Sequence, residues 1–432
     1  MHHPSELQLT HDARGHQLTN SGIWTPDSRW VAYDVRPHTA SFSGVTIERV
    51  SVPDGRCEVL YRAADGAGVG VVTVAPTLPE RYVFIHGPEH PDAQWQYDFH
   101  HRRGVIVSAE HPGHAETLDA LAITAPYLPG ALRGGSHVHV FSPDGSRLSF
   151  TYNDHVMHEH CPERDQRNIG IALPMGPVQV EKRHPREYDG SHFCVLVSET
   201  TPTPRPGSDD ITRAYEEAWV GQQGYLKENG QQQRWALAFI GDTLARDGSR
   251  VAELFIVDLP AEMAAYRCAG DRPLQGTSRT LPAPPAGIRQ RRLTFTHDRR
   301  HPGLATTPRH WVRSSPDGSA IAFLMSDEQG VVQLWLISPN GGEARQITRG
   351  EHDVQSAFNW HPDGRSILMV MDNSVVRCDV ASGAVARVTA RSAQPPCAEA
   401  VVPSPDGHWV AYMREIDGWP QIFAARLTVD DE

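Results

Sequence analysis

A short turn-and-strand unit that recurs along the chain limits the possible folds more than any other feature. Its clearest copy, residues 315–348, reads "SPDGSAIAFLMSDEQGVVQLWLISPNGGEARQIT". This copy contains a Pro-Asp-Gly turn, an alternating apolar strand, a polar loop, a second strand, a Pro-Asn-Gly-Gly turn and a third strand. A further short strand, "HWVRSS", precedes the first turn. Four antiparallel strands in each repeat predict a blade of a β-propeller.

The spacing of the copies predicts how many blades the chain forms. The turn prolines Pro316, Pro362 and Pro405 follow one another at roughly 45 residues, which is typical of one blade. Earlier copies read "IWTPDSRWVAYDV" and "VFSPDGSRLSFTYND", with a degraded one at "TVAPTLPERYVFIHG". We therefore predict an all-β, seven-bladed propeller with blades at about residues 21–62, 68–126, 136–182, 190–297, 308–348, 354–390 and 397–427. Six blades would merge two units that each carry a turn, and eight would require two strands within residues 200–232.

The fourth predicted blade is interrupted by long insertions. Its strands are expected at "HFCVLVSE", "RWALAFIGD", "AELFIVDL" and "RRLTFTH". The insertion at about residues 200–232 contains apolar residues at helical spacing, which predicts a short amphipathic helix there: Ile211, Ala214, Tyr215, Ala218 and Trp219. Residues 1–432 are accordingly predicted to form a single propeller domain with one helical insertion in blade 4.

The ends of the blades indicate how the ring closes. Blade ends read "RQIT", "RRLT" and "ARVT", and residues 16–19 read "HQLT". The last blade has only three strands near the C-terminus. We expect residues 16–19 to supply its fourth strand, which would close the ring and remove an open sheet edge.

Charge, cysteine usage and motifs exclude several classes of function. A net charge of −12 argues against a nucleic-acid partner, because binding to phosphate requires clustered Lys and Arg. The six cysteines form no C-x-x-C pair, which is typical of reduced thiols in a cytoplasmic protein. We expect no membrane span, because no apolar run is long enough. Neither a nucleotide-binding glycine motif nor a G-x-S-x-G elbow occurs, so we expect no nucleotide cofactor and no serine hydrolase.

Longer segments carry resemblances to known families. Residues 315–348 resemble the TolB-type propeller repeat. The segments "RYVFIHGPEHP", "YDFHHRRGVIV", "RGGSHVHVFSP", "YNDHVMHE" and "SAFNWHPDG", spread over nearly the whole chain, resemble the YidR-like bacterial family. That resemblance implies a propeller and a link to cell-surface or biofilm behaviour, and it carries over no catalytic residues. Oligogalacturonate lyase is similar in architecture, a cytoplasmic propeller that holds a divalent metal through several His and a Gln, and this similarity is an analogy of fold.

Histidines are unusually frequent, with 24 in the chain, and propeller geometry gives many of them a common location. The loops that enter the inner strands and those that link the second and third strands meet over one end of the channel, where ligands bind. Several imidazoles with a carboxylate or amide suit Zn²⁺ or Mn²⁺. We therefore predict a divalent metal, Mn or Zn, with these candidate ligands: His137, His139, His192 and His310.

Other polar residues on the same loops are predicted to contact a ligand. Arg309 and Arg313 flank His310 and are predicted as catalytic residues that hold a substrate carboxylate. The remaining ligand-binding candidates are His86, His100, His101, Arg102, Asp154, His155, Gln355 and Glu399. Each histidine has an alternative interpretation as a buried group that is hydrogen-bonded to a neighbouring blade.

Two functions of different classes follow from these patterns. The first is a His-rich pocket for a small anionic ligand or oligosaccharide, in which a metal acts as Lewis acid for a lyase or related enzyme on an acidic saccharide. The second is a non-catalytic scaffold with a protein partner, connected with cell-surface or biofilm behaviour.

Overall fold

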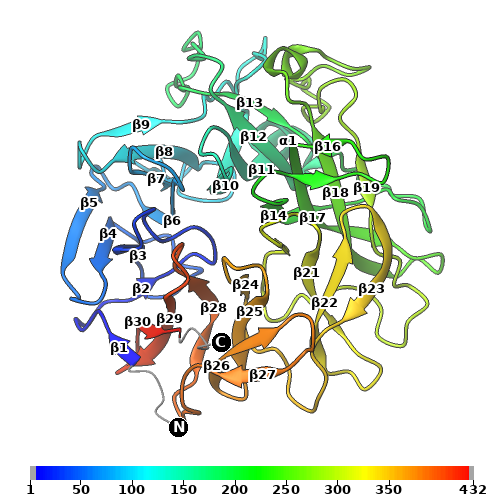
Figure 1. Ribbon diagram of the computed structural model, residues 1–432. Coiled ribbons are helices and arrows are strands. Elements are labelled where there is room, and N and C mark those ends of the chain that lie inside the picture. Colours follow the sequence, from blue (N-terminus) through cyan, green and yellow to red (C-terminus); the bar gives the residue numbers. More distant parts are fainter. Residues whose placement is uncertain (1–5, 428–432) are drawn as a thin grey trace.

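Seven four-stranded antiparallel sheets are arranged in a ring in the computed structural model, which describes residues 6–427 (Figure 1). The seven-bladed β-propeller predicted from the repeats is confirmed. Blade 1 consists of β2 (His16–Gln17), β3 (Trp30–Val35), β4 (Thr46–Ser51) and β5 (Cys57–Arg62). Blade 2 consists of β6 (Val69–Val74), β7 (Arg81–His86), β8 (Arg103–Ser108) and β9 (Ala115–Thr117). Blade 3 consists of β10 (Gly134–Phe141), β11 (Leu148–Asp154), β12 (Asn168–Leu173) and β13 (Phe193–Leu196).

The remaining four blades follow the same plan. Blade 4 consists of β14 (Ala214–Trp219), β17 (Trp235–Leu244), β18 (Arg250–Leu259) and β19 (Gln290–Arg292), with the small hairpin β15 (Tyr225–Leu226) and β16 (Gln232–Gln233) inserted after β14. Blade 5 consists of β20 (Arg313–Ser314), β21 (Ile321–Ser326), β22 (Val332–Ser338) and β23 (Gly341–Gln346). Blade 6 consists of β24 (Asn359–Trp360), β25 (Ser366–Met371), β26 (Ser374–Asp379) and β27 (Val385–Arg387). Blade 7 consists of β28 (Pro396–Pro403), β29 (Trp409–Ile416), β30 (Trp419–Arg426) and β1 (Glu6–Gln8).

Helical structure is confined to short connections. The α-helix α1 (His155–His160) follows β11, and a 3₁₀ turn, Pro162–Arg164, comes directly after it. A second 3₁₀ turn, Met263–Arg267, lies between β18 and β19. Within residues 6–427, no helix is long and apolar enough to cross a membrane.

The Pro-Asp-Gly turns are held by the residue types that the repeat supplies. In blade 3, Ser142 Oγ donates to Asp144 Oδ1 at 2.7 Å, and the Gly145 N–H donates to Ser142 O at 2.7 Å. Gly145 has φ 70°, a left-handed conformation that glycine adopts without a Cβ clash. The copy that begins at Ser315 makes the same contacts. The core lies between neighbouring blades, where the apolar faces of adjacent sheets pack together.

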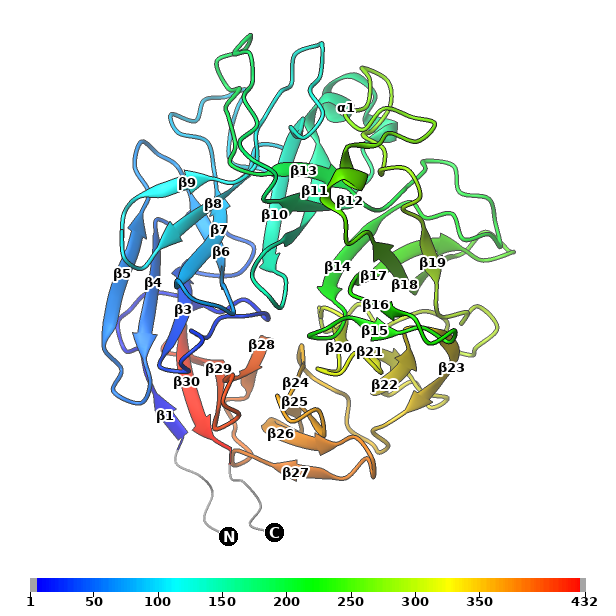
Figure 2. The ribbon, with the colours of Figure 1, turned by 45° about the horizontal axis from the view of Figure 1, so that its top comes forward.

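Ring closure occurs through an earlier strand than expected. β1 pairs antiparallel with β30, with Leu7 opposite Ala424 (Figure 2). Residues 16–19 instead begin blade 1, where His16 pairs with Val35 of β3. An N-terminal strand therefore closes the last blade as predicted, but the prediction that residues 16–19 form it was wrong. The reason is that "HQLT" is an inner strand whose ending resembles the end of a blade.

The predicted helix within residues 200–232 is absent from the structure of blade 4. Residues Ala214–Trp219 form its inner strand β14, which pairs with β17. The segment "HFCVL", which we assigned to blade 4, is β13 and pairs with β12 as the outer strand of blade 3. Both sides of β14 are buried between blades 3 and 5, so its apolar residues do not alternate as in a half-exposed strand.

Candidate functional site

Two cavities lie toward opposite ends of the inner strands. The larger, about 1300 Å³, is reached by the loops that enter those strands, whereas the smaller, about 660 Å³, lies beside the Pro-Asp-Gly turns. The strand β10 runs from one cavity to the other: His137 lines the larger cavity, and Phe141, near the end of the strand, lines the smaller one. We call the larger cavity the arginine mouth after six residues that line it: Arg36, Arg102, Arg167, Arg213, Arg250 and Arg309.

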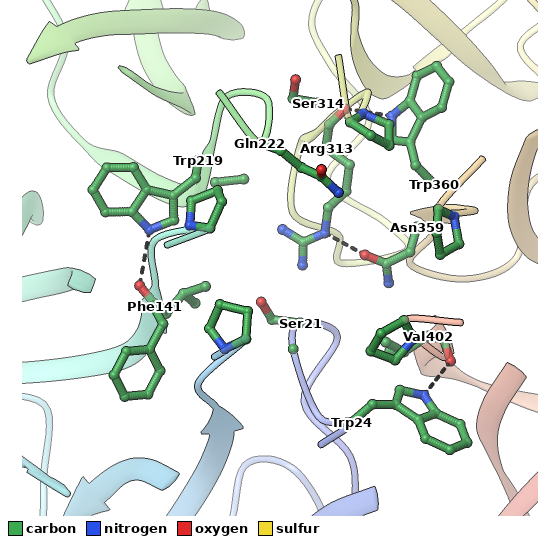
Figure 3. A pocket seen from close by; sticks show the side chains of 18 of the residues that line it. Ser21, Trp24, Phe141, Trp219, Gln222, Arg313, Ser314, Asn359, Trp360 and Val402 are labelled. Atoms are coloured by element: carbon green, nitrogen blue, oxygen red, sulfur yellow. Dashed lines mark hydrogen bonds between the residues drawn. The ribbon is translucent and has the colours of Figure 1, made fainter. Parts of the chain in front are cut away.

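The smaller cavity is lined mainly by tryptophans, prolines and turn residues that hold neighbouring blades together. Figure 3 shows Trp24, Trp219 and Trp360 around it, each on a different blade. Each indole N–H donates to a backbone carbonyl of an adjacent blade, those of Val402, Val140 and Arg313. These bonds join neighbouring blades at 3.0–3.1 Å, so the tryptophan N–H groups are already satisfied.

The wall of the arginine mouth contains the same strained backbone feature in three consecutive blades. Val71, Val138 and Glu216 have φ values of 59°, 55° and 55°. Each lies at a register shift between the inner strand and the second strand of its blade, and all three line the mouth. A left-handed β-branched residue is a conformational outlier and costs about 1–3 kcal/mol. Bulges of this kind redirect side chains and are frequent beside binding sites.

Two guanidinium groups of the mouth that are not exposed, those of Arg102 and Arg167, have no carboxylate partner among the described residues. Arg102 is 6% exposed and donates through Nε to Asp98 O at 3.1 Å. Arg167 donates through Nε to Asn153 Oδ1 at 3.1 Å. Among residues 6–427, no carboxylate oxygen lies within 4.0 Å of either guanidinium. Burial, together with neighbouring arginines, lowers the pKa of each to about 10, so both remain charged at neutral pH.

Aromatic rings support these cations. The Arg102 guanidinium lies 4.8 Å from the ring centroid of Phe42 and 4.5 Å from that of Phe99. Phe99 also stacks under Arg167, at 5.3 Å. Cation–π contacts stabilise an arginine without neutralising it, so the positive charge stays available to a ligand.

The open edge of the mouth adds two exposed arginines. Arg213 lies 4.4 Å above the Tyr215 ring. Arg309 lies 4.7 Å above the Trp311 ring and donates through Nε to Glu216 Oε1 at 2.8 Å. The Glu216 carboxylate therefore balances Arg309 and leaves the Arg102 and Arg167 charges uncompensated.

His137 provides a neutral polar group in the same cavity. It is 4% exposed, and within the described part of the chain its Nδ1 has no hydrogen-bond partner. Burial, with Arg102 and Arg167 nearby, holds the pKa of His137 well below its usual value. A buried polar atom without a partner requires an explanation, and a ligand in the mouth would supply one.

The structure brings part of the predicted site together. Five of the predicted residues line the arginine mouth: Arg102, His137, Arg309, Gln355 and Glu399. Arg313 instead lines the smaller cavity, where its Nε donates to Asn359 Oδ1 at 2.9 Å.

The four predicted metal ligands are not gathered around one point. His139 Nε2 lies 3.0 Å from Ser136 Oγ, and His192 Nδ1 lies 2.9 Å from Ser191 Oγ. His310 Nε2 accepts from the Leu324 N–H at 3.3 Å. Across the described chain, none of these histidines or His137 belongs to a group of three ligand atoms close enough for a metal.

The remaining predicted residues lie outside the arginine mouth. His86 Nε2 lies 3.0 Å from Tyr61 Oη. Asp154 forms a fully buried ion pair with Arg133, at 2.7 Å between Oδ2 and Nη2. The other three flank α1 and the β7–β8 loop: His100, His101 and His155.

Sequence reasoning missed several residues of the mouth, above all Arg167, Arg213 and Glu216. The latter two were hidden by the helix assigned to residues 200–232. Arg167 directly precedes β12, and a search for basic residues next to strand starts would have found it. Nothing in the sequence indicates that Phe99 and Arg167 meet.

The fold and the mouth define a β-propeller with a cationic cavity at one end of its channel. The chain is 60% identical over 412 residues to the uncharacterized protein YidR of Escherichia coli (strain K12), with 95% of each chain covered, and it therefore belongs to the YidR family. A family model described as "Protein of unknown function (DUF3748)" matches residues 68–188.

Solved structures share the fold at low identity. Oligogalacturonate lyase in complex with manganese superposes with a TM-score of 0.59 at 11% identity, covering 98% of this chain and 93% of that one. Oligogalacturonate lyase from Vibrio parahaemolyticus gives a TM-score of 0.55 at 9% identity, covering 98% and 94%. These similarities describe the propeller.

Proposed function

We propose that the arginine mouth binds a carboxylate-bearing ligand, an acidic oligosaccharide. The observation that carries the proposal is the pair Arg102 and Arg167, two guanidinium groups without carboxylate partners among the described residues. The chain has a net charge of −12, so the mouth is positively charged in a molecule that is negatively charged overall. Unpaired cations in a partly buried cavity favour binding of an anion.

The shape and lining of the mouth fit a sugar better than an inorganic ion. A cavity of about 1300 Å³ is larger than a typical drug-sized pocket, which spans roughly 300–1,000 Å³. Phe42 and Phe99 are 38% and 45% exposed and present flat apolar faces beside Arg102. A guanidinium binds a carboxylate through two parallel hydrogen bonds, and an apolar ring face can pack on the sugar next to it.

The fold neighbours support the choice of uronate. Their names describe lyases of oligogalacturonate, a chain of carboxylate-bearing sugars. In β-elimination a proton leaves the carbon beside the carboxylate and the glycosidic carbon–oxygen bond at the next carbon breaks, leaving a carbon–carbon double bond. Guanidinium groups on that carboxylate would stabilise the negative charge that develops.

A metal in the mouth does not fit the residues present. One neighbour is described with manganese, which favours oxygen and imidazole ligands. The mouth offers His137, Glu399 and Gln355, but no three ligand atoms from His, Cys, Asp or Glu converge there within the described chain. The proposed binding therefore depends on arginines.

Calorimetry with trigalacturonate and a neutral galactose trisaccharide tests the proposal. We expect the acidic ligand alone to bind, and its affinity to fall with added salt because ionic contacts are screened. Arg102→Gln and Arg167→Gln should each weaken binding at least about tenfold, the loss of one charge-assisted contact. Arg365→Gln, an exposed arginine in the Pro-Asp-Gly turn of blade 6, is the matched control. Equal affinity for both trisaccharides, or no binding of either, would refute the proposal.

Elimination is measured separately. Ultraviolet absorbance of the unsaturated product is followed with trigalacturonate, with and without Mn²⁺. Binding without product would limit the function to recognition of the acidic saccharide.

A further inference from the structure

A second cluster of ionisable side chains includes a residue of the β7–β8 loop but does not line the arginine mouth. It contains His100 from that loop, His158 from α1 and Asp165 from the segment after α1. We propose that this histidine–aspartate cluster is a binding site for a divalent transition metal of the zinc class. The site is separate from the arginine mouth and does not depend on the function proposed for it.

The distances within the cluster suit an ion. His100 Nε2 lies 2.7 Å from Asp165 Oδ2, and His158 Nδ1 lies 3.5 Å from the same oxygen. The three ligand atoms lie within 4.8 Å of one another. Tetrahedral zinc with bonds of about 2.0–2.2 Å holds its ligand atoms roughly 3.3 Å apart. The two observed separations lie on either side of that value, so small side-chain movements admit the ion.

Hydrogen bonding alone leaves the cluster incomplete. Asp165 Oδ2 faces both imidazoles, while Asp165 Oδ1 is buried and has no hydrogen-bond partner in residues 6–427. A buried carboxylate oxygen without a partner is costly. The rings of His100 and His158 stack at 4.0 Å between centroids, so two nitrogen ligands approach the carboxylate from adjacent positions. A cation would satisfy the carboxylate and both imidazoles together.

The local sequence builds this arrangement. Asp154 caps α1, because its Oδ1 accepts from the Met157 N–H at 2.8 Å. The helix ends at His160, and the 3₁₀ turn Pro162–Arg164 reverses the chain and brings Asp165 beside the helix. His155 and His158 are three residues apart and lie on one helix face, opposite the consecutive His101 and His100.

The neighbouring histidine pair explains why the ion would bind at His100 and His158. His101 Nε2 lies 3.1 Å from His155 Nδ1, and Trp95 stacks on His101 at 3.7 Å. His101 Nδ1 also lies 2.9 Å from Gln96 O, so both ring nitrogens already have partners. The His158 side chain is 49% exposed, which leaves room for a water molecule as a fourth ligand.

The donor set selects the class of metal. Two imidazole nitrogens and one carboxylate oxygen are typical of zinc and similar transition metals, with an open position for water. Calcium and magnesium prefer sites made of oxygen ligands. We therefore expect Zn²⁺ to bind and Mg²⁺ not to compete.

Equilibrium dialysis with Zn²⁺, followed by elemental analysis, tests the site in the full-length, tag-free chain. All proteins carry His2→Ala and His3→Ala, so that the N-terminal histidine pair contributes no binding. We expect one zinc per chain, unaffected by excess Mg²⁺. His158→Gln and Asp165→Asn should each weaken zinc binding at least tenfold.

The matched control is His160→Gln, which removes an exposed imidazole from the same helix and should retain zinc. Circular dichroism confirms folding, and His158→Gln keeps the test valid if Asp165→Asn does not fold, because His158 is half exposed. The proposal is overturned if the chain binds no zinc at micromolar free metal. It is also overturned if the His158→Gln chain binds as much zinc as the chain with His158. No saccharide enters the experiment, so its result is separate from that for the arginine mouth.

Discussion

Buried histidines in this propeller act as neutral hydrogen-bonding groups. Burial lowers the pKa of His139 to about 3, and those of His192 and His310 to about 4. Each has a nearby oxygen or backbone partner. The sequence correctly placed His139 and His310 on or beside inner strands, but His192 directly precedes β13, the outer strand of blade 3. For each histidine, the partner that decides between a ligand and a hydrogen-bonding group is supplied by folding and is not visible in the sequence.

His310 gives a prediction about stability and pH. Its neutral Nε2 accepts from the Leu324 N–H, and its Nδ1 donates to Pro308 O. In the unfolded chain a histidine takes up a proton near pH 6.5, whereas folded His310 does so only near pH 4. The unfolded state therefore binds more protons between these values. The stabilisation is fully present above pH 6.5 and is lost as the pH falls toward 4, at about 1.4 kcal/mol per pH unit.

Urea unfolding from pH 7.5 to 4 measures this contribution. The free energy of unfolding of His310→Gln should fall less steeply between pH 6.5 and 4 than that of the unchanged chain, by about the slope of one proton. Other titrating groups are common to both proteins and cancel in the difference. His114→Gln, an exposed position, should keep the original slope. Parallel curves for all three proteins would contradict the prediction.

At the scale of single elements, β14 shows why a strand was predicted as a helix. The bulge at Glu216 places two residues of β14 opposite one of β17, between the pairs Tyr215–Ile240 and Ala218–Ala238. Tyr215 and Ala218 face blade 5, while Ala214 and Trp219 face blade 3. Apolar residues in a half-exposed strand recur at every second position. In β14 both faces are buried and the bulge inserts one residue, so its apolar residues instead recur at the spacing of a helix. A local pattern cannot reveal this, because the bulge is specified by neighbouring blades.

The closing strand β1 gives a prediction about the ring. Glu6 binds Arg414 through two hydrogen bonds, at 2.9 and 3.0 Å, and the Leu9 N–H donates to Ile422 O at 2.8 Å. Deleting residues 1–9 removes these contacts, leaves Arg414 without its carboxylate partner and exposes the β30 edge. We expect a free energy of unfolding lower by roughly 2–4 kcal/mol, together with self-association through the free edge.

Thermal unfolding and light scattering measure both effects. The chain without residues 1–5, which keeps β1, is the reference, so that the difference between the two shortened chains reports residues 6–9 alone. The same midpoint and the same light scattering for both shortened chains would show that β1 does not stabilise the ring.

At the scale of the whole molecule, the fold was predictable because each blade carries its own turn and its own alternating strands. The site was predictable only in part, because the arginine mouth is assembled from several blades. The loops that enter the inner strands were correctly placed at one end, which brought His137, Arg309 and Glu399 together. In our proposal the arginines, and not the histidines, carry the charge that binds the ligand. That choice depends on which carboxylates lie near each arginine: Asp154, for example, pairs with Arg133, outside the mouth.

One segment contributes residues to both proposed sites, which predicts that binding at one site affects the affinity at the other. In residues 97–103, Phe99 and Arg102 line the arginine mouth, and His100 belongs to the histidine–aspartate cluster. A metal that binds His100 to His158 would fix this loop against α1 and hold Arg102 in place. Gly135 also packs closely against this loop, since a Cβ there would lie 2.3 Å from Phe99 O. Zinc should therefore reduce the ordering cost of anion binding at Arg102.

We expect Zn²⁺ to tighten trigalacturonate binding about fivefold, the lower end of typical coupling between sites. The same factor must apply in reverse, so the saccharide should tighten zinc binding equally. Calorimetry in Zn²⁺ and in chelator measures the first effect, and dialysis with and without saccharide measures the second. His158→Gln should bind the saccharide with the affinity of the metal-free chain under both conditions, whereas His160→Gln should retain the coupling. Affinity that is identical with and without zinc, in a chain shown to bind both ligands, would establish that the loop transmits nothing between the two sites.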